Sequence, residues 1–387
     1  MGELTGLRGR ARVLYAAPFV TTFDRFSIAP LLVPIAHDLH ESLGAVTAVA
    51  TAYYVLYGGM QLVYGLLSDR VGWIRLMRLT CLATCAAGIV SALAPNLPVL
   101  IVGRALTGSL ICAILPTSLV YVGDRFPFRV RQRVIATLLA SVAVGTTAAT
   151  LGAGLLAHYA TWRIVFLLPA LCALGLSIML RWVPESAPGG GAGPMATLRR
   201  LARERWLLFL CPVAVLEGAA ILGNLTFLAP ALEAHGANPA LAGLVVAAYG
   251  VAVLGGTQLV KRVRLRPHAM LLGGGMLLVA GYASAAVDQH VPGILVANLL
   301  AGLAYATMHS TFQAWATEAV PEARGAATAM FVTAAFVGAG IGTSALAPLT
   351  QSGRWTLLFA IAAAATVPVA VIGAAGRRRF GERLAAR

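Results

Sequence analysis

The sequence predicts an all-α membrane protein with twelve transmembrane helices, arranged as two pseudo-symmetric six-helix bundles. The prediction rests on composition, on the placement of basic residues and on an internal repeat. Of the 387 residues, 59% are hydrophobic and 11% are charged, whereas soluble domains carry about 25% charged residues. This composition excludes a soluble enzyme, a secreted domain and a disordered chain. A helix needs about 20 mainly apolar residues to cross a bilayer, and the chain is long enough for twelve such spans.

Apolar runs separated by polar or helix-breaking residues locate the helices. The expected spans are 13–36, 45–67, 76–94, 98–122, 134–157, 164–183, 206–232, 240–260, 268–287, 292–317, 326–350 and 355–376. One long gap, 184–205, is rich in Pro and Gly and then becomes basic, which is typical of a flexible linker followed by an interfacial helix. This cytoplasmic linker separates an N-terminal bundle, 1–183, from a C-terminal bundle, 206–387.

The basic residues fall almost entirely in alternate gaps between the spans. With the N-terminus in the cytoplasm, 25 of the 29 Lys and Arg residues lie in cytoplasmic segments or helix ends, and two, Arg163 and Arg354, lie on the opposite side. Cytoplasmic loops of membrane proteins carry such an excess. The net charge of +15 therefore indicates topology rather than nucleic-acid binding, and both termini are expected in the cytoplasm.

The two halves of the chain repeat one another. GGMQLV at 58–63 recurs as GGTQLV at 255–260. Three landmarks around the fifth span also have counterparts around the eleventh: Arg133, Trp162 and Phe166 correspond to Arg324, Trp355 and Phe359. Parallel repeats in transporters place the substrate site near the bilayer midplane between the halves.

A distinctive motif occupies the loop between the second and third spans. Residues 65–72 have the sequence GLLSDRVG, and the fourth span contains RALTG from Arg104. These two segments resemble the motifs G-x-L-[AS]-D-R-x-G and R-x-x-Q-G of the major facilitator superfamily. The resemblance to this superfamily extends over essentially the whole length of the chain. The chain departs from the pattern at Thr107, which replaces Gln, and at 73–74, where Trp-Ile stands in place of two basic residues.

The resemblance implies a secondary active transporter whose halves rock about a central cavity. It also implies a cytoplasmic latch in the 65–72 loop, in which Asp69 pairs with Arg129 or Arg133 when that side closes. The gating residues expected on this basis are Gly65, Asp69, Arg70, Gly72, Arg129 and Arg133.

Two acidic residues, Asp24 and Glu217, lie well inside spans 1 and 7. A charge at mid-bilayer is costly unless it faces a partner or a wet cavity. We expect these two carboxylates to exchange protons, with Asp24 as the main group, and the motif match adds Arg104 to the proton-coupling residues. The alternative is structural, with Asp24 paired to an Arg of a neighbouring helix.

Two polar stripes at helical spacing occupy spans 2 and 10, where lipid-facing surfaces would not carry Gln or His. They form either a substrate wall or hydrogen bonds between helices. Arg25 has three possible placements: its side chain extends to the membrane surface, pairs with another helix or faces the cavity. The candidate cavity residues are Arg25, Tyr53, Tyr57, Gln61, Asn224, Tyr305, His309 and Gln313.

Small residues recur every fourth position in two other spans, which allows close helix packing. These stripes, Gly145/Ala149/Ala153 and Gly338/Gly342, are expected to form the moving interface between the halves. The sequence contains no phosphate-binding loop, no cluster with metal-ligand spacing and no nucleophile motif. We therefore expect no cofactor, no metal and no enzymatic activity.

The function expected is proton-coupled export of amphipathic small molecules. Span 1, at 23–34, is similar to that of drug:proton antiporters and sugar-efflux relatives, but span 5 lacks their antiporter proline, which leaves uptake open. The alternatives are transport of a polar solute such as a sugar or metabolite in either direction, a non-transporting receptor and a membrane enzyme. Abundant Ala, Gly and Arg favour a bacterial cytoplasmic membrane. The partners expected are substrate, protons and the bilayer, with the protein as a monomer.

Overall fold

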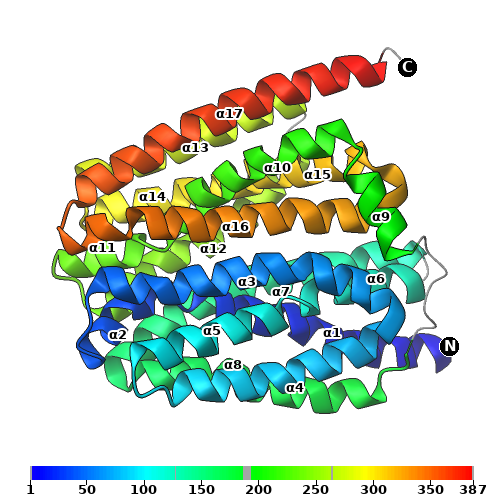
Figure 1. Cartoon of the computed structure of the whole chain (residues 1–387), viewed down its shortest axis with the longest axis horizontal. Coiled ribbons are helices and arrows are strands. Elements are labelled where there is room, and N and C mark those ends of the chain that lie inside the picture. The colour runs from blue at the N-terminus through cyan, green and yellow to red at the C-terminus, as the bar shows by residue number, and fades with distance from the viewer. Residues whose placement is uncertain (1, 127, 186–192, 263–264, 386–387) are drawn as a thin grey trace.

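The computed structural model describes residues 2–126, 128–185, 193–262 and 265–385, and this part of the chain is helical with no strands (Figure 1). Within it, eleven helices or helix runs are long and apolar enough to cross a membrane. A bent pair, Val13–Phe26 with Ala29–Asp38, meets the same test at an angle of 40° and gives the twelfth. The prediction of an all-α membrane protein with twelve spans is confirmed.

The N-terminal half, spans 1 to 6, is built from the first ten elements. These are α1 (Gly2–Phe26), η1 (Ala29–Leu31), α2 (Leu32–Asp38), α3 (Leu43–Val71), α4 (Trp73–Ala92), α5 (Leu97–Ile111), α6 (Ile114–Arg125), α7 (Phe128–Tyr159), α8 (Trp162–Met179) and η2 (Leu180–Trp182). A short helix, α9 (Pro194–Leu201), follows inside the predicted linker and lies at the end of the molecule that carries both termini (Figure 1).

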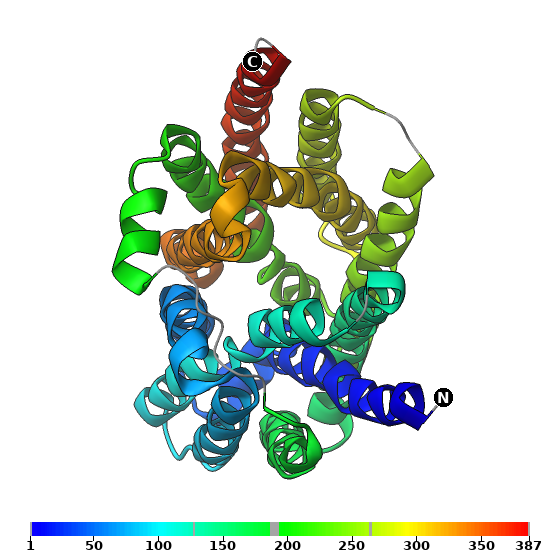
Figure 2. The ribbon, with the colours of Figure 1, turned by 90° about the vertical axis from the view of Figure 1, so that its right-hand side faces the viewer.

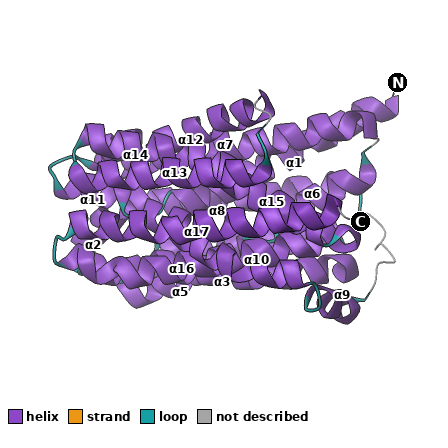
Figure 3. Ribbon diagram, turned by 90° about the horizontal axis from the view of Figure 1, so that it is seen from above, coloured by secondary structure: helices purple, strands orange, loops and turns teal. Residues whose placement is uncertain are grey.

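The C-terminal half, spans 7 to 12, contains the remaining elements. These are α10 (Arg205–Gly218), the π-helical turn η3 (Ala219–Gly223), α11 (Leu228–Ala234), α12 (Pro239–Arg262), α13 (Pro267–Val287), α14 (Val291–Ala304), the π-helical turn η4 (Tyr305–His309), α15 (Ser310–Ala319), η5 (Pro321–Ala323), α16 (Arg324–Gln351) and α17 (Trp355–Ala385). One buried apolar cluster lies in the C-terminal half, and the other lies mostly in the N-terminal half but also includes Leu222, Phe336 and Ala339. The helices run roughly along the long axis of the molecule (Figure 3).

Capping residues fix where two helices begin at the end of the molecule opposite the termini, which is called the far end below. Ser42 accepts a hydrogen bond from the backbone N–H of Ala45, and Asn96 accepts one from that of Val99. Such side chains satisfy N–H groups that have no partner within the helix. Helices α3 and α5 therefore begin after loops of only a few residues.

Four spans are discontinuous, and they occupy corresponding places in the two halves. Span 1 breaks between α1 and α2, and span 4 breaks between α5 and α6. Their counterparts, spans 7 and 10, contain the π-helical turns η3 and η4. π-Helical turns within helices are frequent at functional sites, and in transporters discontinuous helices surround the substrate site.

The halves meet along two symmetry-related pairs of helices, α3 with α16 and α7 with α12 (Figures 1 and 2). Between α7 and α12 the backbones touch at Gly154 and Gly243. Between α3 and α16, Thr333 donates a hydrogen bond to the carbonyl of Gly58 at 2.9 Å. Glycine permits these contacts because it has no Cβ atom, and the approaching backbone leaves no room for one.

The expectation for the small-residue stripes is wrong. Gly145 packs against the backbone of Phe19 on α1, and Gly338 packs against Val215 on α10. Both contacts lie within one half, so these stripes hold spans 1 and 5, and spans 7 and 11, together. Residue spacing predicted close packing correctly, but it does not say which neighbouring helix is approached.

Several helix ends also differ from prediction. α17 continues to Ala385 rather than ending near 376. Arg377 in this extension forms an ion pair with Glu318 of α15 at 2.7 Å, which ties the extension to span 10. α7 begins at Phe128 instead of 134.

Candidate functional site

Asp24 and Arg104 form a buried ion pair in the N-terminal half. The guanidinium of Arg104 donates to both carboxylate oxygens of Asp24, at 2.7 and 3.0 Å, and to its backbone carbonyl at 3.2 Å. Asp24 is 1% exposed and Arg104 is 0% exposed. The remaining faces of the guanidinium lie against the rings of Tyr53 and Phe166. Two parallel charge-assisted hydrogen bonds fix both side chains in one geometry.

A second buried pair, of a carboxylate and an imidazole, lies in the C-terminal half, where Glu217 contacts His309. The Glu217 Oε1 to His309 Nδ1 distance is 2.8 Å, and both side chains are buried. Glu217 precedes η3, and His309 is the last residue of η4. The His309 ring stacks on Tyr305 with centroids 4.4 Å apart. Each half therefore pairs an acid on its first span with a nitrogen base on its fourth.

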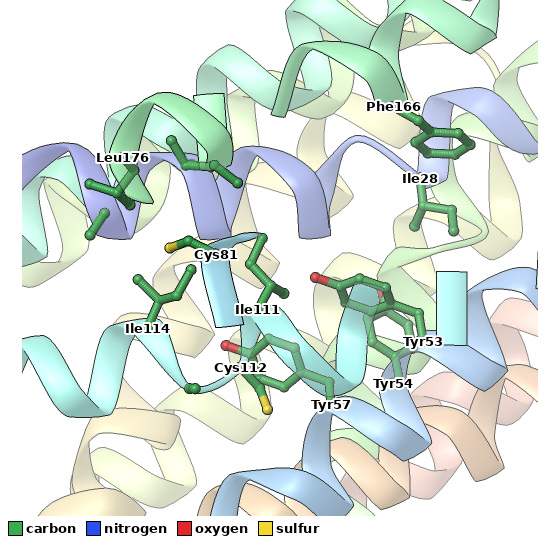
Figure 4. Packing of buried hydrophobic residues seen from close by; sticks show 14 of the residues in the cluster. Ile28, Tyr53, Tyr54, Tyr57, Cys81, Ile111, Cys112, Ile114, Phe166 and Leu176 are labelled. Carbon is green, nitrogen blue, oxygen red and sulfur yellow. The ribbon is translucent and has the colours of Figure 1, made fainter. Parts of the chain in front are cut away.

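Aromatic rings lie between the two pairs at the interface between the halves, and they form a run in two parts. Its first part is on α3, where Tyr53 stacks on Tyr57, and Tyr57 contacts Phe336 of α16 at 4.4 Å between centroids. Its second part runs from Phe26 to Tyr249 and then to Tyr305, at 5.8 and 6.1 Å. Figure 4 shows the three tyrosines of α3, including Tyr54, grouped in the core of the N-terminal half.

Arg25 joins the two parts of this run. Its guanidinium carbon lies 4.8 Å from the ring centroid of Phe26, 5.6 Å from that of Tyr57 and 5.3 Å from that of Phe336. The residue is 9% exposed. It points into the interface between the halves, away from lipid, and does not pair with the adjacent Asp24, as expected for neighbours on a helix.

A very small cavity of about 10 Å³, barely enough for one water molecule, lies beside Arg25. Its lining comes from both halves and from the breaks in spans 1 and 7: Arg25, Phe26, Ile28, Ala29, Tyr54, Thr150, Leu225, Thr226, Val246 and Tyr249. Tyr54 and Thr226 are within hydrogen-bond distance across it, at 3.3 Å. Ligand pockets usually enclose about 300–1,000 Å³, so this conformation is closed around the site and has no room for a ligand.

Three further predicted cavity residues occupy less central places. Gln61 is buried on α3, and its side-chain oxygen has no partner in the described structure. Asn224 is also buried, but its amide donates to the carbonyl of Ala220 one turn earlier and so supports the π-helical turn. Gln313 on α15 is partly exposed. The described contacts do not bring these three to Arg25.

Part of the predicted latch lies outside the described residues, because the side chains of Asp69 and Arg129 are not among them. Gly65 and Arg70 are exposed on α3, and Arg133 is exposed on α7. Gly72 joins α3 to α4 with φ +95°, a conformation that side chains with a Cβ rarely adopt. The pairing of Asp69 with Arg129 or Arg133 remains a prediction.

The structure adds Glu185 to this region, which the sequence interpretation missed. Its carboxylate accepts hydrogen bonds from the backbone N–H groups of Ile74 and Arg75, at 3.0 and 2.7 Å. An anion is favoured there because α4 begins at Trp73 and its first N–H groups lack helical partners. The available signal was an acid just after span 6, at the start of a segment interpreted only as linker.

Comparison with known sequences decides the family. Residues 14–232 and 210–383 each match the Major Facilitator Superfamily, and together they span nearly the whole chain. The chain belongs to the Major Facilitator Superfamily. The earlier resemblance is thereby confirmed, and its relatives are transporters rather than enzymes.

Two relatives of this superfamily member come from Escherichia coli. Multidrug resistance protein D is 33% identical over 167 residues, 41% of each chain. The 3-(3-hydroxy-phenyl)propionate transporter is 31% identical over 255 residues, 62% of each chain. The chain thus spans less than two-thirds of the lengths of these relatives.

Solved structures share the fold over nearly the whole length. A mutant of the peptide transporter POT superposes with a TM-score of 0.78, at 16% identity and covering 97% of this chain and 95% of that one. An inward-facing bacterial homologue of the human lysosomal transporter Spinster gives 0.73, at 17% identity and 97% of both chains. At such identities the likeness concerns the fold alone.

Proposed function

We propose that this superfamily member is a secondary active transporter that exports amphipathic small molecules in exchange for protons, by rocking its two halves about the Arg25 cavity. The observation that carries the proposal is the presence of one buried acid–base pair in each half, joined by aromatic rings that cross the interface. Charged residues inside transmembrane spans are costly and mark ion and substrate pathways.

The two pairs differ in the kind of base that holds the acid. Arg104 keeps its charge at all working pH values, so Asp24 gains a proton only when its contact with Arg104 loosens. The imidazole of His309, unlike a guanidinium, exists in neutral and protonated forms, so a proton can reside on either partner of the second pair. We propose that Asp24, Arg104 and Glu217 couple protons to the rocking motion and that His309 acts with Glu217.

Rings from both halves supply an apolar surface suited to an amphipathic substrate. Multidrug resistance protein D and the puromycin resistance protein pur8 of Streptomyces alboniger, 28% identical over 182 residues, support a drug-like cargo. The 3-(3-hydroxy-phenyl)propionate transporter supports the second candidate, a metabolite carried in either direction, and this aromatic acid also suits a ring-lined site.

The proposed location is a bacterial cytoplasmic membrane with both termini in the cytoplasm. The structure places the two termini at the same end (Figure 1). Most basic residues lie in segments predicted for that side, and the excess of positive charge supports the orientation.

The first prediction concerns proton coupling in proteoliposomes with an imposed pH gradient. The cargoes are two permanently charged amphipaths, 3-phenylpropane-1-sulfonate and trimethyl(3-phenylpropyl)ammonium, which do not cross lipid unaided. Wild-type protein should accumulate one of them when the gradient is present, and Asp24→Asn should abolish the accumulation. Glu217→Gln should reduce it about tenfold or more.

The control for these variants is binding of the same cargo without a gradient, which both should retain. Arg378→Gln, on an exposed turn of α17, serves as an unrelated change and should transport as wild type. Gradient-driven accumulation at the wild-type rate in both acid variants contradicts proton coupling through these groups.

A further inference from the structure

We propose that Arg25 is the binding site for the anionic headgroup of the substrate, so that the cargo is an amphipathic organic anion with an aromatic body. This inference rests on the proposed function, because it assigns the substrate class of the same central cavity. The juxtaposition that carries it is a guanidinium with no carboxylate partner among the described residues, in a ring-lined space between the halves.

Arg25 lacks the partner that the other buried arginine has. No carboxylate of the described residues forms an ion pair with it, and its guanidinium contacts the rings of Phe26, Tyr57 and Phe336 instead. Arg104, at similar burial, is held by both oxygens of Asp24. A buried charge without a counter-charge destabilises a protein, and a ligand anion would supply that counter-charge.

The charges of the other central groups favour an anion over a cation. Asp24 is neutralised by Arg104, and Glu217 is hydrogen-bonded to His309. Arg25 is the only charged residue among the described residues that line the cavity. A cationic cargo would meet this charge with no free carboxylate nearby, whereas a carboxylate or sulfonate matches the planar fork of a guanidinium.

The rings beside Arg25 indicate the rest of the ligand. Phe26 and Tyr249 line the cavity, and the ring centroids of Tyr57 and Phe336 lie 5.6 and 5.3 Å from the guanidinium carbon. Aromatic faces attract one another in offset or edge-on arrangements. An aryl group attached to the anion by a short chain would contact these rings while its headgroup reaches Arg25.

The position of the cavity links binding to the motion of the halves. Arg25, Phe26 and Tyr54 belong to the N-terminal half, and Thr226 and Tyr249 belong to the C-terminal half. The cavity volume of about 10 Å³ is far too small for an aryl acid, because ligand sites enclose about 300–1,000 Å³. An aryl acid is therefore admitted only when the halves separate, and it then bridges them when they close.

The test is binding of a matched series to purified full-length protein by isothermal titration calorimetry at pH 7. The probes are 4-phenylbutyrate, 3-phenylpropane-1-sulfonate, neutral 3-phenylpropan-1-ol and trimethyl(3-phenylpropyl)ammonium. At least one of the two anions should bind more tightly than the alcohol and the ammonium compound. Arg25→Gln should weaken that anion by about 10- to 100-fold, the effect of losing hydrogen bonds to a charged group. Arg25→Lys should retain part of the preference.

Stability separates a binding role from a structural one. Arg25→Gln loses the ring contacts of the guanidinium but also removes a buried charge that has no counter-charge, so the ligand-free unfolding temperature should stay close to that of wild type. Arg378→Gln removes one exposed positive charge from the chain and should bind the anion as wild type does.

Several outcomes overturn the inference: no saturable binding of either anion to wild type, equal affinity for the ammonium compound, or unchanged anion binding in Arg25→Gln. An Arg25→Gln protein that unfolds at a clearly lower temperature also overturns it, because Arg25 would then be structural. The proposed function fails separately, when the pH gradient drives no accumulation of any cargo. Anion binding that depends on Arg25 would survive that result.

Discussion

A guanidinium and a carboxylate that are both removed from water stabilise the protein only while they remain together. Arg104 and Asp24 are essentially inaccessible to solvent and hold each other through two hydrogen bonds. Removal of one partner from such a buried pair costs about 3–5 kcal/mol, since the other charge is left alone, whereas removal of both is far less costly. The pair is therefore a structural contact in this conformation as well as a candidate for proton coupling.

The corresponding prediction is a double-variant cycle at this pair. Arg104→Gln and Asp24→Asn should each lower the unfolding temperature measured in detergent. The combined variant Asp24→Asn/Arg104→Gln should recover most of the loss, because no buried charge remains unpaired. A combined loss equal to the sum of the two single losses would show that the side chains are not coupled. The combined variant also separates misfolding from lost proton exchange in the transport measurement.

The candidate residues could be found from the sequence, but their partners could not. A charged side chain inside an apolar run stands out because of its cost in lipid, and this identified Asp24, Glu217 and Arg104. Pairing depends on how each helix is rotated and tilted against its neighbours, which spacing along one helix does not determine. His309 was accordingly assigned either to a substrate wall or to hydrogen bonds between helices, with no partner named, and the structure puts it against Glu217.

At the scale of elements, the contact of α7 with α12 depends on the absence of side chains. A Cβ atom on Gly243 would lie 2.5 Å from the carbonyl oxygen of Thr150 and 2.8 Å from the Cα of Gly154. Gly255, on the same helix, has no atom within 4 Å of that position. One helix thus offers both a test position and a matched control.

Gly243→Ala should push α12 away from α7 and destabilise the protein by about 1–3 kcal/mol, the usual cost of overpacking. Gly255→Ala should be neutral or stabilise by up to about 1 kcal/mol, because alanine favours the helix. Thermal unfolding of the two purified variants measures the difference. Equal unfolding temperatures would show that the two helices are not tightly packed in the protein.

The twelve spans were predictable because each must form all its backbone hydrogen bonds within one apolar run. Their interruptions were less visible, since the π-helical turns at 219–223 and 305–309 contain no proline and follow no break in hydropathy. The extension of α17 past 376 was missed for a different reason. Its turns are basic and lie beyond the apolar run, and contacts such as Arg377 with Glu318 attach them to the molecule.

At the scale of the whole molecule, the far end is closed by side chains that cross between the halves. Gln351 at the end of α16 donates a hydrogen bond to Ser42 at the start of α3, at 3.1 Å, and Ser344 donates one to Thr51 at 3.2 Å. In the described structure the other cross-half hydrogen bonds join Thr333 with Gly58 and Tyr54 with Thr226. Alternating access requires the contacts at the far end to break in every transport cycle.

The last prediction is that a covalent link at the far end stops transport. Ser42→Cys combined with Gln351→Cys, on a background without the five native cysteines, places two thiols at contacting positions. Because the far end is proposed to face outward, a membrane-impermeant bifunctional thiol reagent added to intact cells should join them. Linked protein should lose gradient-driven transport, and a reducing agent that cleaves the linker should restore it. Each single-cysteine variant with the same reagent is the control and should keep transporting. Reaction that requires permeabilised cells would reverse the proposed orientation, and full transport by linked protein would show that the halves do not separate at this end.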